Sequence, residues 1–135
     1  MSEVLDILLA GTARNVQQKP QEQEYKVLRL SDELGQEVVF RLRGLGYSKC
    51  QELADREEMD VWTVLAGTVA PDFQDVRLAV KYGLLQEGQS WGMGGVTPPD
   101  LVKAMLLPGE IKALSRAIQQ LSGYQLITVE SVKKN

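Results

Sequence analysis

The chain has 135 residues, of which 44% are apolar and 24% are charged, as expected for one globular domain with a buried core. Its 15 basic and 18 acidic residues give a net charge of −3, so it lacks the concentrated positive field that nucleic-acid binding requires. One cysteine and no histidine exclude an intramolecular disulfide and remove the commonest catalytic base and metal ligand. We therefore expect a non-catalytic cytoplasmic protein that uses no cofactor or metal and binds neither nucleic acid nor membrane.

The first segment predicts a short apolar helix from the N-cap Ser2 to Ala10. This segment lacks the basic start of a signal peptide and is too short to span a bilayer. The polar, glutamine-rich residues 13–24 then predict a flexible arm. The expected organisation is a helix and arm over residues 1–23 and a single domain over residues 24–135. The sequence leaves open whether the helix docks on its own domain or on a neighbouring molecule.

Two strands are expected at the start of the domain, over Tyr25–Leu30 and Glu37–Arg43. The polar residues and glycine of Ser31–Gly35 predict a hairpin loop between them. A lone hairpin is marginally stable in water, so its apolar face must pack on helices or on further strands.

The second strand alternates cleanly, which places Val38, Phe40 and Leu42 on one face. Arg41 and Arg43 fall on the other face. They form either a solvated sheet edge, where charge discourages unwanted pairing, or a polar contact site for a partner.

The rest of the chain predicts helices. Residues 61–69 are rich in β-branched side chains, which makes a strand the competing interpretation there, but Trp62, Ala66 and Gly67 interrupt any alternation. A last segment, Thr128–Lys134, is either a short helix or a tail. The capping residues, prolines and glycines predict helices from Ser48 to Glu57, from Asp60 to Val69, over Val76–Tyr82 after the N-cap Asp75, from Thr97 to Leu106, and from Pro108 to Leu121.

The last helix has the clearest pattern, because apolar residues recur three and four positions apart and Gly123 follows its end. We expect the edge of this helix to contribute both to the core and to a partner-binding surface. Its apolar positions are Ile111, Leu114, Ile118 and Leu121.

A glycine-rich stretch over residues 88–95 has neither the spacing nor the lysine of a nucleotide-binding loop. It predicts a loop between two helices. Trp91 within it either packs on the body and anchors the loop, or is available to contact a partner protein.

The acidic residues at the predicted junction of two helices are interpreted as solvated caps and not as a metal or acid–base site. Cys50 lacks a histidine to activate it and is interpreted as a buried structural thiol. The acidic residues are Asp55, Glu57, Glu58 and Asp60.

The last third of the chain resembles a known family. The run Thr97-Pro98-Pro99-Asp100-Leu101-Val102-Lys103-Ala104-Met105-Leu106-Leu107-Pro108-Gly109-Glu110, followed by Leu121-Ser122-Gly123-Tyr124, is similar to the C-terminal part of the XkdN-like phage tail assembly chaperones. Further matches occur in order at Val39–Arg43, Val69–Phe73 and Lys81–Gly83. The resemblance covers about residues 24 to 125, and Leu-Pro-Gly-Glu is its most specific element. The loop from Gln86 to Gly95 is longer and richer in glycine than this family leads us to expect.

The predicted strands and helices together indicate an α+β protein, mainly α-helical, with an N-terminal β-hairpin packed on a helical bundle. The family resemblance implies a phage or prophage chaperone that binds and solubilises the tape measure protein in the host cytoplasm. Contact with the tail tube protein and a homo-oligomeric state are compatible with this role. We expect the partner to contact the apolar side chains Leu5, Leu8, Leu9, Trp91, Ile111, Leu114, Ile118 and Leu121.

Two other functions remain open at this point: a minor structural or completion protein of the phage tail, and a regulatory adaptor protein of the host.

Overall fold

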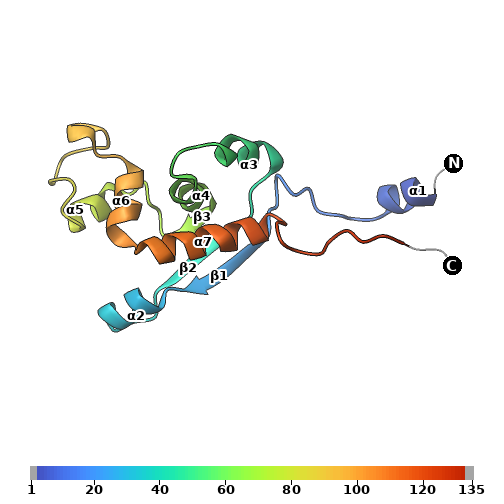
Figure 1. Cartoon of the computed structure of the whole chain (residues 1–135), viewed down its shortest axis with the longest axis horizontal. Coiled ribbons are helices and arrows are strands. Elements are labelled where there is room, and N and C mark those ends of the chain that lie inside the picture. Colours follow the sequence, from blue (N-terminus) through green and yellow to red (C-terminus); the bar gives the residue numbers. More distant parts are fainter. Residues whose placement is uncertain (1–2, 133–135) are drawn as a thin grey trace.

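The computed structural model describes residues 3–132 of the chain. Figure 1 shows a body of helices and a small sheet, from one end of which both chain termini extend. Its elements, in chain order, are α1 (Glu3–Ala10), β1 (Glu22–Lys26), α2 (Leu28–Leu34), β2 (Val39–Arg43), α3 (Tyr47–Ala54), α4 (Met59–Gly67), β3 (Thr68–Ala70), α5 (Val76–Lys81), the 3₁₀ turn η1 (Met93–Gly95), α6 (Pro98–Met105) and α7 (Pro108–Leu121). The expected α+β fold, mainly helical, is confirmed.

The three strands form an antiparallel sheet in the order β1-β2-β3. Phe40 and Leu42 are buried on the face that packs against the helices, and Val38 packs beside them, as predicted. Arg41 and Arg43 are exposed on the opposite face, where they lie across from Glu24 and Glu22 of β1. The prediction that these arginines mark a sheet edge is wrong, because β2 is the central strand.

The connection between the first two strands is a helix and not a hairpin loop. β1 ends at Lys26, and α2 contains the residues expected to end the strand and to form the turn. The reason is tertiary: α2 buries Leu30, and the Ser31 hydroxyl donates to Val27 O and accepts from Val38 N, both at 2.8 Å. Gly35, in the left-handed region at φ 67°, ends the helix.

The predicted helix starts are confirmed at three places and wrong at two. Asp75 caps α5 by accepting from Arg77 N, and Asp100 accepts from Thr97 N at 2.8 Å at the start of α6. Pro108 is the first residue of α7. By contrast, Gly46 and Glu58 occupy the positions before α3 and α4, so Ser48 and Asp60 lie inside the first turns of these helices.

The chain after α4 forms β3, which the sequence analysis did not predict as a separate strand. The competing strand interpretation was therefore correct for Thr68 and Val69, where the predicted helix is wrong, and the helix prediction is confirmed from Asp60 to Gly67. The segment after residue 127 contains no helix as far as Val132, where the described chain stops. Ser2, Lys133 and Lys134 lie outside the described residues.

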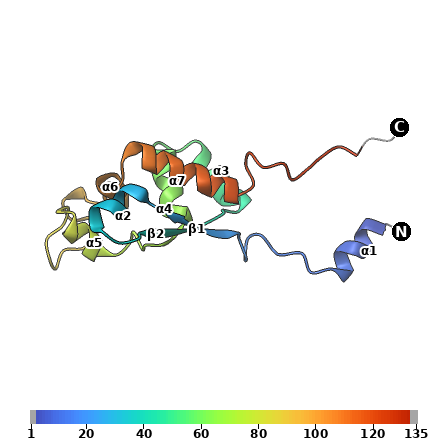
Figure 2. The same cartoon turned by 90° about the horizontal axis from the view of Figure 1, so that it is seen from below.

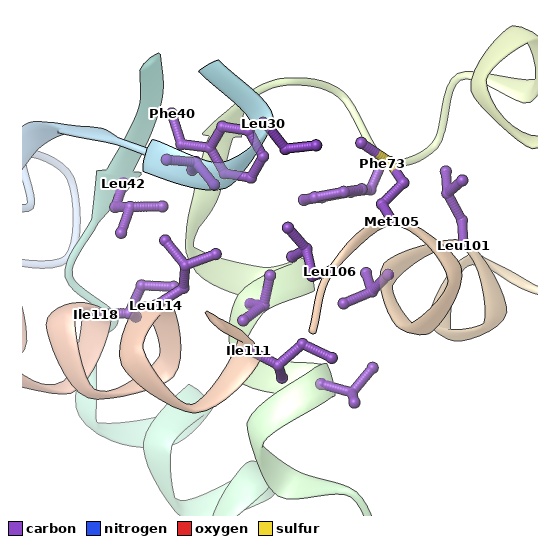
Figure 3. Close-up of a cluster of buried hydrophobic side chains, with 14 residues drawn as sticks. Leu30, Phe40, Leu42, Phe73, Leu101, Met105, Leu106, Ile111, Leu114 and Ile118 are labelled. Carbon is purple, nitrogen blue, oxygen red and sulfur yellow. The ribbon is translucent and has the colours of Figure 1, made fainter. Parts of the chain in front are cut away.

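The core lies between the sheet and the helices α4, α6 and α7 (Figure 3). Phe40 and Phe73 meet edge to face with their ring centroids 6.0 Å apart. Gly67 allows α4 to approach α7 closely, because a Cβ there would lie 2.6 Å from the Ile118 side chain. Gly44 similarly allows the end of β2 to pass the end of α7, since its Cβ would lie 2.4 Å from Leu121 O. These two close approaches position the C-terminal half of α7 against α4 and the end of β2.

Candidate partner-binding surface

The helix α1 stands away from the body and buries none of its side chains in it (Figures 1 and 2). Five of its eight residues are large and apolar, and all five are exposed. Their exposed fractions are 63% for Val4, 49% for Leu5, 66% for Ile7, 64% for Leu8 and 75% for Leu9. An exposed apolar group of this kind is typical of a surface that binds another chain.

The C-terminal arm leaves the same end of the body as α1 (Figures 1 and 2). After Gly123 the chain is irregular, and its apolar side chains are largely exposed, with Ile127 at 91% and Val129 at 88%. Both arms therefore carry apolar surface beyond one end of the domain.

At this end, α3, α4 and the end of α7 enclose an apolar hollow of about 210 Å³. Its lining includes Leu53, Met59, Ile118 and Tyr124. A second hollow, of about 390 Å³, continues from it toward the roots of both arms. The two hollows share Leu45, Cys50, Ser122 and Tyr124, and together we call them the arm-end groove.

Cys50 is half-buried in the arm-end groove, with its thiol 3.8 Å from Leu45 O. Electrostatic repulsion from Cys50 raises the pKa of Tyr124, because the negative charge of a phenolate would form close to the sulfur. The thiol is therefore a groove-lining group and is less buried than the sequence analysis expected.

The partner-binding residues predicted on α7 lie mainly in the core. Ile111 and Leu114 are each 7% exposed and Ile118 is fully buried, while Leu121 is half-buried at the edge of the groove. The structure brings Ile118 and Leu121 to the groove and places Ile111 and Leu114 farther along the core (Figure 3).

Trp91 anchors the glycine-rich loop. Its indole N–H donates to Gln74 O at 2.7 Å, and its ring packs against the core cluster. Of the two alternatives left by the sequence, the structure therefore supports the anchoring one.

The Leu-Pro-Gly-Glu element begins α7 and joins it to α2. The Glu110 carboxylate accepts from Leu107 N at 2.7 Å, which satisfies a free donor before the helix. Arg29 donates to the same carboxylate through Nε and Nη2, at 3.0 and 2.8 Å, and to Met105 O. The arginine lowers the pKa of Glu110, and the carboxylates of Glu110 and Glu33 raise the pKa of Arg29. The sequence analysis missed Arg29, because its partner lies 81 residues away.

Two of the four acidic residues interpreted as solvated caps have defined partners. Asp60 accepts from the buried Ser115 hydroxyl at 2.7 Å, and Glu58 pairs with Lys103 at 3.0 Å. Both contacts join α4 to its neighbouring helices. The other two acidic residues, Asp55 and Glu57, are exposed as predicted.

No group of acidic or cysteine side chains within residues 3–132 could hold a metal ion. In that same range, no helix is long and apolar enough to cross a membrane.

The described chain thus carries an exposed apolar helix away from the body and an apolar groove at the end of the body from which the arms leave. The model of the phage XkdN-like tail assembly chaperone family matches residues 46–134, about two thirds of the chain. The chain therefore belongs to this family. The match starts after β2, so the expected resemblance is confirmed from residue 46 onward. No curated protein and no solved structure shows significant similarity to the chain.

Proposed function

We propose that this protein binds the tape measure protein of its phage, keeps it soluble in the host cytoplasm and supports assembly of the tail tube around it. The observation that carries the proposal is the exposure of all five large apolar side chains of α1. Membership of the tail assembly chaperone family gives the general role.

The physical argument concerns the client. A tape measure protein is a long helical chain with apolar stripes, and such stripes cause aggregation until they are covered. A short apolar helix can cover them through contacts repeated at helical spacing. Several copies bound along one client would cover a length that a single small domain cannot.

The solubility of the client tests this proposal. We would co-express the tape measure protein with the full chain, with a variant carrying Leu8→Ser and Leu9→Ser, and with a control carrying Leu28→Ser and Leu34→Ser. The control residues are 69% and 63% exposed on α2, at the end of the body opposite the arms. We expect the full chain and the control to keep the tape measure protein in the supernatant, and the α1 variant to leave it in the pellet.

A tape measure protein that stays soluble without the chain would contradict the proposal. Mass spectrometry of purified virions separates an assembly role from a structural one, since a chaperone should be absent from the finished particle.

A further inference from the structure

We propose that α1 of one copy docks into the arm-end groove of a second copy, so that the apolar helix is covered when no client is bound. This inference requires only the geometry of α1 and of the groove, and it stands independently of which client the protein binds.

The first argument is apolar complementarity. α1 gathers its large side chains on one side of the helix, with Glu3 and Asp6 on the other side, so it offers one continuous apolar face to be covered. Its eight residues span about 12 Å. The arm-end groove offers two connected hollows of about 210 and 390 Å³, whose shared walls include Leu45 and Tyr124.

The second argument is charge. α1 carries Glu3 and Asp6 and no basic residue. Arg14 lines the groove, and Arg43 and Lys49 line a third hollow that shares Leu45 and the neighbouring glycines with it. Among residues 3–132, no acidic side chain lines any of these three hollows.

This distribution of charge is notable because the chain as a whole has more acidic than basic residues. Lys49 also meets Glu52 at 3.3 Å, but that pair is exposed and binds weakly. The two acidic residues in the first turn of α1 and the basic residues around the groove therefore attract each other.

The third argument concerns which copy supplies the helix. Only residues 11–13 separate α1 from Arg14, and three residues span about 10 Å at most. The following residues are held in a turn, in which Asn15 accepts from Gln17 N and Lys19 N. To reach its own groove, α1 would have to reverse direction across the arm that lines it. The helix of a second copy meets no such restriction.

Because α1 and the groove are different surfaces, the contact is heterologous and leaves a free helix and a free groove at the two ends of each pair. Copies can then join into a ring or an open chain, and a client helix would compete with the groove for α1.

Disulfide trapping tests the docking, since Cys50 lines the groove and is the only cysteine in the chain. We would mix a tagged copy carrying Leu8→Cys and Cys50→Ser with an unmodified copy and oxidise the mixture gently. The matched control carries Leu34→Cys and Cys50→Ser, with its new thiol on α2. We expect the α1 thiol to give at least tenfold more mixed disulfide than the control thiol.

Equal trapping by the two thiols would overturn the proposal. So would a Leu8→Cys chain that retains Cys50 and closes a disulfide only within itself, because that result places α1 in its own groove.

Charge reversal sharpens the test. Glu3→Lys with Asp6→Lys on the helix-bearing copy should reduce trapping about tenfold. Arg14→Glu with Lys49→Glu on the groove-bearing copy should restore most of it. Failure of the second pair to restore trapping would contradict the assigned charge contacts. Because no client is present in these experiments, their result is separate from that of the solubility test.

Discussion

The first and last helices of this protein both carry large apolar side chains but use them in opposite ways. α7 buries Ile111, Leu114 and Ile118, whereas α1 buries no side chain in the body. The difference lies in the surroundings: α7 begins directly after α6 and lies on α4 and β2, while α1 is separated from β1 by a polar arm. Apolar periodicity thus predicts that a helix forms, and the neighbouring elements decide what it covers.

The largest loss of stability is expected from shortening a buried side chain of α7. Ile118 is fully buried against Gly67, so Ile118→Ala leaves a cavity that the close helix pair cannot fill. We expect the free energy of unfolding to fall by about 2–5 kcal/mol, measured by urea denaturation. A loss below about 1 kcal/mol would show that α7 is not the central core helix.

The next largest loss of stability is expected where Gly44, at the end of β2, passes close to the backbone at the end of α7. Gly44→Ala would place a Cβ 2.4 Å from Leu121 O, so a backbone segment must move. We expect a loss of about 1–3 kcal/mol in the same measurement.

Gly109→Ala is the matched control for that substitution, because nothing lies within 4 Å of the added Cβ. It should leave stability unchanged or raise it by up to about 1 kcal/mol, since alanine favours the helix. Similar losses at the two glycines would contradict the tight passage at Gly44.

A smaller effect is expected where α7 is joined to α2. Glu110→Gln retains an oxygen that can accept from Leu107 N but removes the charge that pairs with Arg29. Because the two side chains are 20% and 30% exposed, we expect a loss of only about 0.5–1.5 kcal/mol at neutral pH.

The pH dependence of that loss follows from the lowered pKa of Glu110. The contribution of the carboxylate is complete above its unfolded pKa of about 4.3 and disappears as the pH falls through the lower folded value. The difference between the native chain and Glu110→Gln should therefore vanish in acid. A difference that persists there would assign the effect to packing.

The smallest change in stability is expected from a substitution on α1. Leu8→Ala should change the free energy of unfolding by less than about 0.5 kcal/mol in dilute solution, because Leu8 is 64% exposed and outside the core. A loss comparable to that of Ile118→Ala would mean that α1 packs on its own body.

Local signals in the sequence were sufficient for much of the fold. Asp75, Thr97 and Pro108 start their helices as predicted, since caps and prolines act within one turn of chain. The alternation around Phe40 correctly predicted the buried face of β2, and the run ending in Glu110 led to the correct family.

The sequence did not predict α2, the third strand or the central position of β2. Residues 28–30 are two leucines and an arginine, which favour a helix, but the prediction extended the strand that begins at Tyr25 across them. In the structure they are helical, with Arg29 bound to Glu110 and Leu30 in the core. The arm-end groove was also missed, because its walls come from α3, α4, α7 and both arms, which are distant in the chain.

The sequence by itself determined that this is a mainly helical α+β protein of a tail assembly chaperone family and that an apolar helix precedes its domain. Only the tertiary structure decided that α7 uses its apolar stripe inside the body, that α1 keeps its own exposed, and that a groove forms at the end of the body from which the arms leave. The physical reason is that helix formation depends on residues within a turn or two, whereas burial depends on which distant surfaces the folded chain brings together.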